Sequence, residues 1–221
     1  MSIRRSFLLL LVAGAAALCT ASPVLAQARP AMGWSQLPTI TVLSAPEDAR
    51  LPLVRDAVVY WNSIFAELGS AFRLGPVAEA AGSIPAGELA ALSQATLQNP
   101  GPAPLPEAVR TAPGNIVIVL SDGDFVSFTR RWSHAAKALV AIRSERLYPM
   151  TLPNVARNVI AHELGHAIAL GHNSDPAMLM CGRPAPCRPD AFASPNEHYF
   201  PLSADQRTLL LRLYPADWKP E

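Results

Sequence analysis

The segment HELGHAIALGH, from His162 to His172, constrains the fold of this chain more than any other stretch, because it holds three of the five histidines. On a helix of about 3.6 residues per turn, His162 and His166 lie one turn apart on the same face, so both imidazoles can reach one ion. His172 is too far along the chain to share that face if the helix continued. The segment therefore predicts a helix that ends inside the motif, with Gly171 suited to the turn that brings the third histidine back.

Three converging imidazoles are a ligand set that zinc accepts, and three protein ligands leave a fourth position for water, as in catalytic zinc sites. Glu163 points roughly 100° round the helix from His162, so its carboxylate can approach that water without becoming a ligand. Coordination lowers the pKa of the water to about 7, and Glu163 can then take its proton while zinc polarises a substrate carbonyl. The residues thus predict one catalytic zinc ion held by His162, His166 and His172, with Glu163 as the general base.

The alternative for any helical histidine is an ordinary hydrogen-bonded polar residue, and the short pattern H-E-x-x-H also occurs by chance. The third histidine at the correct spacing favours the zinc site. His134 and His198 have no such context. They are expected to be surface or hydrogen-bonding histidines, although His198 lies in a loop that could border the site.

The N-terminal segment has the pattern of an export signal that is removed. It has a positive start at Arg4 and Arg5, an apolar run from Phe7 to Leu18, and small residues at Ala26 and Ala28. The signal is expected to cover the first 26 residues, with cleavage after residue 28 as the alternative. The apolar run is too short to span a bilayer, so an uncleaved anchor is the less favoured interpretation. The mature protein is expected to be secreted or periplasmic, through the general secretory route or the twin-arginine route.

Cys181 and Cys187 are the only cysteines beyond the predicted signal. In an exported protein such a pair is expected to form a disulfide, and the alternatives are two reduced cysteines or an accessory metal site. The formal net charge is +1 for the whole chain and becomes −1 when Arg4 and Arg5 are removed. No basic stripe indicates a nucleic-acid partner.

Hydrophobic periodicity predicts alternating strands and helices in the rest of the chain. Residues 76–114 are expected to be mostly a surface insertion, because prolines are frequent there. Strands are expected at 39–44, 115–122 and 137–144, with a weaker one at 71–77; helices are expected before Gly69, at 88–97, from Thr151 or Leu152 through the histidine motif, and after Ser203.

The stretch HELGHAIALGHNSDPAMLMCG resembles the metzincin zinc metallopeptidases, and most of all their matrixin branch. It has the zinc helix, the third histidine and the methionine turn of that family in the same order. By this resemblance Met180 is the Met-turn methionine, which packs beneath the metal without binding it. Gly182 stands where other branches carry a tyrosine ligand. The closing segment LSADQRTLLLRLYP and the early segment YWNSIF also resemble the family, so the likeness covers residues 38–215.

The resemblance implies an α+β fold of the zincin type. Its sheet is expected to be twisted and mostly antiparallel or mixed, with an early helix on it, a zinc-binding helix beneath the cleft and a C-terminal helix. The implied activity is that of an exported zinc endopeptidase that binds an extended peptide or protein substrate along the sheet edge. A catalytically silent protein that uses the same fold to bind peptides is the alternative.

Two positions leave open questions about this resemblance. Ala169 stands where the family has glycine, and a left-handed alanine costs about 1–2 kcal/mol unless Gly171 shifts the turn. The segment SDGD, Ser121 to Asp124, could bind calcium or could form an ordinary solvated turn.

Overall fold

The described part of the chain comprises residues 32–98, 103–152, 154–183 and 185–221 of a computed structural model. The expected export signal, with both of its cleavage positions, lies outside these residues. Within the described ranges, no helix combines the length and the apolar character needed to cross a membrane. The elements run from Ile40 to Leu213, inside the expected domain of residues 38–215.

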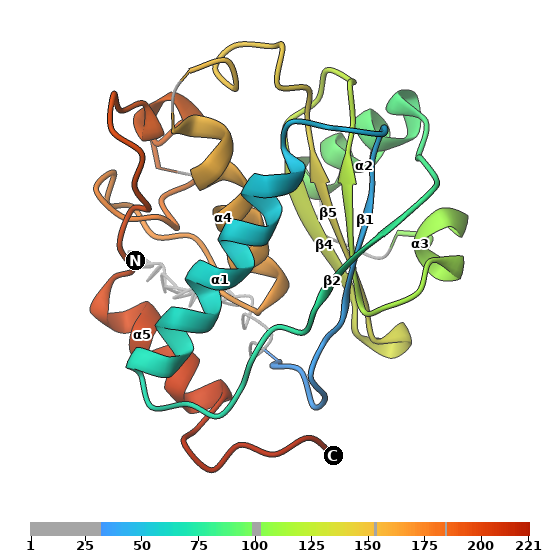
Figure 1. The fold of residues 1–221 in the computed structure, drawn as a ribbon. Helices are drawn as coiled ribbons and strands as arrows, with labels where there is room; N and C mark the ends of the chain where they lie inside the picture. The colour runs from blue at the N-terminus through green and yellow to red at the C-terminus, as the bar shows by residue number, and fades with distance from the viewer. Residues whose placement is uncertain (1–31, 99–102, 153, 184) are drawn as a thin grey trace, which may run out of the picture. The chain divides into compact units, whose positions relative to one another are not determined.

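A five-stranded sheet forms the centre of the described residues, in the order β2-β1-β3-β5-β4 (Figure 1). Its strands are β1 (Ile40–Leu43), β2 (Val77–Ala80), β3 (Ile116–Leu120), β4 (Phe128–Trp132) and β5 (Lys137–Ile142). Strand β4 is antiparallel to β5, and the other pairings are parallel. The sheet is mixed, but the expectation of mostly antiparallel pairing is wrong. One helix lies between β1 and β2 in the chain, and two further helices lie between β2 and β3, whereas β3 reaches its parallel neighbour β5 through the outer strand β4.

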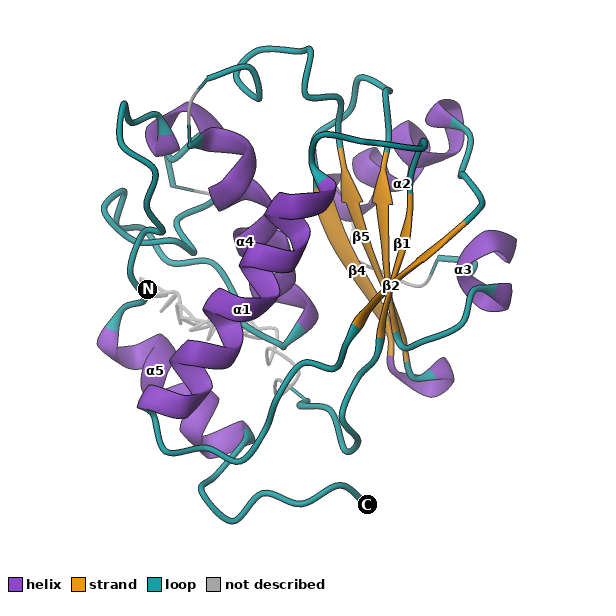
Figure 2. Cartoon of the chain, in the orientation of Figure 1, coloured by secondary structure: helices purple, strands orange, loops and turns teal. Residues whose placement is uncertain are grey.

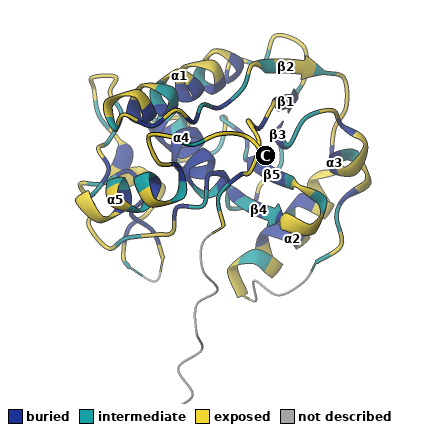
Figure 3. Cartoon of the chain, turned by 90° about the horizontal axis from the view of Figure 1, so that it is seen from below, coloured by how far each residue is buried: buried dark blue, intermediate teal, exposed yellow. Residues whose placement is uncertain are grey.

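Helices cover both faces of this sheet (Figure 2). On one face lie α1 (Leu51–Glu67) and α4 (Val155–Ala167), which pack against each other and against alternate strand residues. On the other face lie α2 (Ala86–Gln98) and α3 (Glu107–Thr111). The outward sides of α1 and α2 are exposed in Figure 3, whereas all five residues of β3 are buried. A strand buried on both faces has no polar alternation, which explains the continuous apolar run IVIVL.

The structure differs from the sequence-based expectations in the connections. Residues 76–114 are not mainly an insertion, because they form β2, α2 and α3, which complete one edge and one face of the sheet. The weak strand expected at 71–77 begins only at Val77. Strand β4 was not expected from the sequence, and α4 begins at Val155, with Asn154 as its N-cap, and not at residue 151 or 152.

The closing helix α5 (Ala204–Leu213) begins as the sequence predicts, with a capping box formed by Ser203 and Gln206. Gln206 also connects this helix to the end of the histidine motif. Its Nε2 donates to the carbonyl oxygen of Gly171 at 3.2 Å, and its Oε1 accepts from Nδ2 of Asn173 at 3.1 Å. The helix start therefore holds both residues that flank His172.

Candidate metal centre

The three histidines of the motif converge on one point at the end of α4. The Nε2 atom of His162 lies 3.1 Å from that of His166 and 3.2 Å from that of His172, and the last two are 3.0 Å apart. A tetrahedral ion with Zn–N bonds of about 2.0–2.1 Å separates its nitrogen ligands by about 3.3 Å. The donor type, the number of donors and their spacing fit zinc, and this is the group of metal-binding side chains found among the described residues.

Each imidazole is held in the tautomer that a metal ligand needs. The Nδ1–H groups of His162, His166 and His172 donate to backbone carbonyl oxygens, at 2.7, 2.8 and 2.9 Å respectively. These acceptors belong to Leu179, Leu170 and Arg183. With Nδ1 protonated, the lone pair of each neutral ring lies on Nε2, which is the converging atom.

Burial keeps these rings neutral. It lowers the pKa of His162 to about 4, although the bond to Leu179 acts in the opposite direction. Burial, together with the charges of the other two histidines, lowers the pKa of His166 well below its usual value. Burial also lowers the pKa of His172. Near neutral pH all three rings are therefore unprotonated on Nε2 and able to bind a metal ion.

Ala169, and not Gly171, makes the turn at the end of α4. Its φ is +80°, whereas Gly171 is absent from the residues with positive φ. The amide of Ala169 donates to His166 at 3.0 Å and that of Leu170 donates to Gly165 at 3.0 Å, which together form a Schellman motif. The question left open by the sequence is thus settled in favour of a left-handed alanine, and His172 still reaches the other two histidines.

The turn that holds Met180 packs against α4 between the first two histidines of the motif. Met180 is fully buried, and its sulfur packs so closely on Gly165 of α4 that a β-carbon at Gly165 would overlap it. A short parallel bridge between Asn173 and Cys181 joins this turn to the segment after His172. Leu179, one residue before Met180, supplies the carbonyl that orients His162. The methionine turn therefore positions two of the three histidines through backbone contacts.

Gly182, two residues after Met180, lies directly against the ring of His172. A β-carbon at Gly182 would overlap the ring of His172. The glycine therefore allows the third histidine to lie against the backbone of the methionine turn, and a tyrosine could not occupy this position without displacing His172.

Glu163 lies beside the three histidines without joining them. Its side chain is buried, and its Oε2 lies 2.8 Å from Oγ1 of Thr129 on β4, which is also 2.7 Å from the Glu163 carbonyl oxygen. Burial raises the pKa of Glu163 to about 7, although the Thr129 contact lowers it. A carboxyl group poised near neutral pH can both accept and return a proton. Thr129 was not predicted, because no pattern in FTRRW marks a strand residue that faces the motif.

A cleft of about 740 Å³ opens over Glu163 and the three histidines. One side is the outer strand β4 together with Val126 and Ser127. Apolar side chains at Met150, Val159 and Phe192 line a deeper part. The loop between Cys181 and Cys187 contributes the facing wall, and these two cysteines form the expected disulfide, with Cα atoms 5.8 Å apart.

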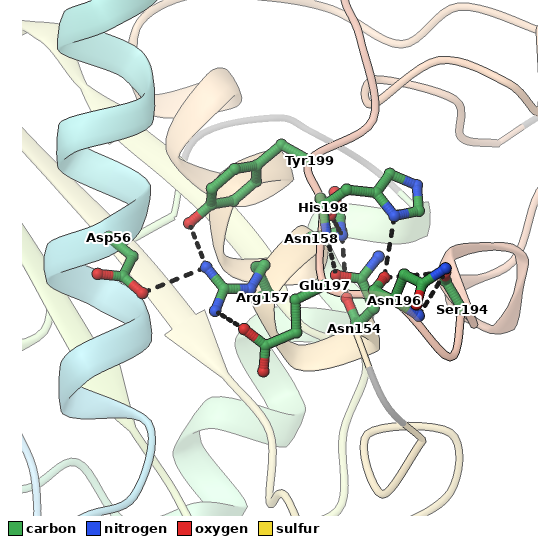
Figure 4. A network of polar contacts seen from close by, with 9 residues as sticks. All are labelled: Asp56, Asn154, Arg157, Asn158, Ser194, Asn196, Glu197, His198 and Tyr199. Atoms are coloured by element: carbon green, nitrogen blue, oxygen red, sulfur yellow. Dashed lines mark hydrogen bonds and ion pairs between the residues drawn. The ribbon is translucent and has the colours of Figure 1, made fainter.

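The loop after the disulfide is fastened to α4 and α1 by the polar network in Figure 4. Arg157 of α4 forms ion pairs with Asp56 of α1 at 3.2 Å and with Glu197 of the loop at 2.7 Å, and its guanidinium lies over the ring of Tyr199. Burial lowers the pKa of Arg157, but the hydrogen bond to Tyr199 and the nearby acidic groups outweigh this effect, so the pKa lies above its usual value. The network therefore attaches the loop to the side of α4 that carries Arg157.

Two buried asparagines complete this attachment. Asn158 donates to the carbonyl of His198 at 2.9 Å and accepts from the amide of Phe200 at 2.9 Å. Asn154 accepts from the amide of His198 at 3.0 Å. The ring of His198 stacks on Phe200 and does not line the cleft, and its Nδ1 contacts the carbonyl of Asn196. Sequence reasoning missed both asparagines, although an asparagine one turn before the first histidine was a visible signal.

The remaining candidates lie outside the centre. His134 lies in a short 3-10 turn, Ser133–Ala135, after β4. In the SDGD segment, Asp124 pairs with Arg143 at 2.7 Å, and the Ser121 carbonyl accepts from Arg50 at 3.0 Å. These contacts occupy two of the groups that a calcium ion would need, which favours the ordinary solvated turn.

Comparison with known proteins gives distant likenesses in fold. No family model matches the sequence, and no curated protein matches it. The fold resembles archaemetzincin from Methanopyrus kandleri (18% identity, 81% of this chain and 96% of that one, TM-score 0.45). It also resembles metalloproteinase-II from Bacteroides fragilis (14%, 84% and 55%, TM-score 0.47) and a zinc-dependent peptidase from Methanocorpusculum labreanum (18%, 77% and 99%, TM-score 0.35). Because these likenesses are distant, the chemistry of the centre rests on its own residues.

Proposed function

We propose that this protein is a zinc-dependent endopeptidase of the metzincin type, in which His162, His166 and His172 hold the metal and Glu163 is the general base. The observation that carries the proposal is the convergence of three oriented Nε2 atoms beside a buried carboxylate that is not one of the ligands. When bound, zinc lowers the pKa of a coordinated water to about 7 and polarises a carbonyl oxygen.

The protein's own residues supply proton transfer and orientation. Glu163 accepts the proton of the attacking water and returns it to the leaving amine, and a pKa of about 7 suits both steps. Thr129 holds one carboxylate oxygen of Glu163, so the other is available to the water. Because β4 is the outer strand of the described sheet, an extended peptide can add to it by backbone hydrogen bonds and lie across the centre.

The finer parts of the proposal concern the branch and the location. Gly182 after the buried Met180 supports the matrixin branch, because this arrangement leaves the metal with three protein ligands. The disulfide between Cys181 and Cys187 supports an oxidising compartment, and hence a secreted or periplasmic protein with a cleaved signal. Its substrate is a peptide or protein.

Replacing Glu163 by alanine tests the proposal. Glu163→Ala should retain one zinc per chain, measured by metal analysis, while peptide hydrolysis falls by about 10²–10⁴-fold. By contrast, His172→Ala should lose most of the bound zinc in addition to peptide hydrolysis. Glu88→Ala is a matched control, because this exposed glutamate lies in the first turn of α2, outside the cleft, and should change neither quantity.

The result is read by mass spectrometry after incubation of the zinc-loaded protein with a mixed peptide library. Hydrolysis that is unchanged in Glu163→Ala would indicate another base or a contaminating protease. Zinc binding without cleavage of any peptide by the parent protein would instead establish the silent binding protein.

A further inference from the structure

The cleft over the metal centre has an uneven charge. Four arginines line it, at positions 131, 143, 183 and 188. Glu163, the group already assigned to proton transfer, is the only acidic residue among the described residues that line the cleft. The whole chain, by contrast, has nearly equal numbers of basic and acidic residues. The positive charge of the cleft is therefore a local arrangement and not a consequence of composition.

Two of these arginines lie on either side of Thr129 along the sheet edge. Arg131 is two residues further along β4 and therefore lies on the same face, about 7 Å away by strand geometry. Arg143 follows β5, and its amide donates to the hydroxyl of Ser127, two residues before Thr129. A peptide that lies along β4 would therefore pass one arginine on each side of the centre.

The environments of Arg131 and Arg143 leave positive charge for a ligand. Arg131 donates to the carbonyl of Met32 at 2.6 Å and lies 5.0 Å from the ring centroid of Trp34, and no carboxylate of the described residues pairs with it. Burial lowers the pKa of Arg131, which means that its charge is poorly solvated. Arg143 pairs with Asp124, but its buried Nε–H has no acceptor in the described structure.

The other two arginines stand on the facing wall. Arg183 and Arg188 lie in and directly after the loop closed by Cys181 and Cys187, and both are exposed. The carbonyl of Arg183 accepts from Nδ1 of His172, so this residue is fixed next to a metal ligand. The guanidinium of Arg188 donates to the carbonyls of Ala185 and Cys187, and neither arginine forms an ion pair with a carboxylate of the described residues.

We propose that the cleft selects carboxylate-bearing substrates, with Asp or Glu side chains within about two residues of the cleaved bond on either side. The proposal rests on the proposed peptidase function and adds the class of substrate. Arg131 and Arg143 meet acidic side chains along β4, and Arg183 and Arg188 meet them from the facing wall. Exposed arginines attract such groups through charge-assisted hydrogen bonds that weaken as salt is added.

The experiment compares peptides that are acetylated and amidated, so that only side chains carry charge. For one cleaved sequence, Glu is replaced by Gln at positions within two residues of the cleaved bond. The parent protein should cleave the Glu peptide with a kcat/KM about fivefold or more above that of the Gln peptide, and 0.5 M salt should reduce this ratio. In the double variant Arg183→Gln/Arg188→Gln the ratio should fall towards one. Arg212→Gln is the control, because Arg212 is exposed on α5 outside the cleft, and the ratio should stay unchanged.

A binding measurement separates substrate preference from catalysis. Fluorescence anisotropy with a labelled, capped Glu peptide and the Glu163→Ala protein should give a Kd about fivefold below that of the Gln peptide. Zinc content and circular dichroism should match between the parent and all variants, which shows that the arginine changes leave the centre and fold intact.

The outcomes are distinct. Cleavage and binding that are equal for Glu and Gln peptides would overturn the charge preference while the peptidase function stands. A preference for a free C-terminal carboxylate over the amide, without a preference for Glu, would also overturn it, because the recognised group would then be the chain end. If no peptide is cleaved, the peptidase function fails, and the anisotropy measurement still decides whether the cleft prefers carboxylates.

Discussion

Two alanines at the end of α4 should respond in opposite directions to the same substitution. Ala169 has a φ of +80°, and this left-handed conformation costs a residue with a β-carbon about 1–2 kcal/mol. Glycine removes that cost but gives the unfolded chain additional freedom worth about 0.4–1 kcal/mol. We therefore expect Ala169→Gly to raise the free energy of unfolding by about 0.5–1 kcal/mol.

Ala167, two residues earlier, provides the matched control. It is the last residue of α4 and its side chain is fully buried. Ala167→Gly removes a buried methyl group worth about 0.8 kcal/mol. It also places glycine in a helix, which costs up to about 1 kcal/mol more. The free energy of unfolding should therefore fall by about 1–2 kcal/mol.

Urea unfolding of the metal-free, disulfide-intact proteins, followed by tryptophan fluorescence, measures both changes. Zinc binding should be unaffected by Ala169→Gly, because glycine makes the same turn. A loss of stability in Ala169→Gly comparable to that in Ala167→Gly would refute the left-handed turn at Ala169. In that case Gly171→Ala, which the structure accommodates without positive φ or overlap, should prove costly.

Three further predictions concern packing, covalent closure and pH. Gly165→Ala should lower the free energy of unfolding by about 1–3 kcal/mol, because the new methyl group overlaps the methionine-turn sulfur; urea midpoints measure this. Replacing Cys181 and Cys187 by serine should cost about 2 kcal/mol, and two free thiols in the denatured, unreduced parent would contradict the disulfide. Burial raises the pKa of Asp48, but the hydrogen bonds and the charge of Arg50 outweigh this effect and hold the pKa below its usual value of 3.8. Its contribution is therefore present above that pH and lost as pH falls through the lower folded value, and Asp48→Asn should flatten this acid limb of the urea midpoint against pH.

The sequence was most informative where one segment contains its whole signal. The spacing of His162, His166 and His172 was sufficient to predict the metal centre, and Ser203 with Gln206 was sufficient to predict the start of α5. Strands β3 and β5 were visible because burial on both faces leaves an unbroken apolar run. Local patterns of this kind do not depend on the rest of the fold.

The sequence was least informative where pairing partners decide the structure. Strand β4 contains two adjacent arginines, and its buried face is recognised only when β5 lies beside it. The direction of the sheet was mistaken because it depends on the crossovers. The helix expected at 88–97 is confirmed as α2, whereas the prolines that follow it hid α3. Thr129 contacts Glu163 across 34 positions of sequence, so no local pattern could find it. Asn158 lies one turn before His162, but its partner His198 is 40 positions away, so its role could not be derived locally.

The outer position of β4 also bears on how the protein behaves when it is concentrated. An unpaired strand edge can recruit a second copy of the same chain, which leads to filaments and precipitates. In the antiparallel register that sets Arg131 of one copy opposite Arg131 of the other, the two like charges repel. A short acidic peptide meets no such repulsion. The same residue that favours a guest strand therefore discourages self-assembly, and the edge can remain open without making the protein prone to aggregate.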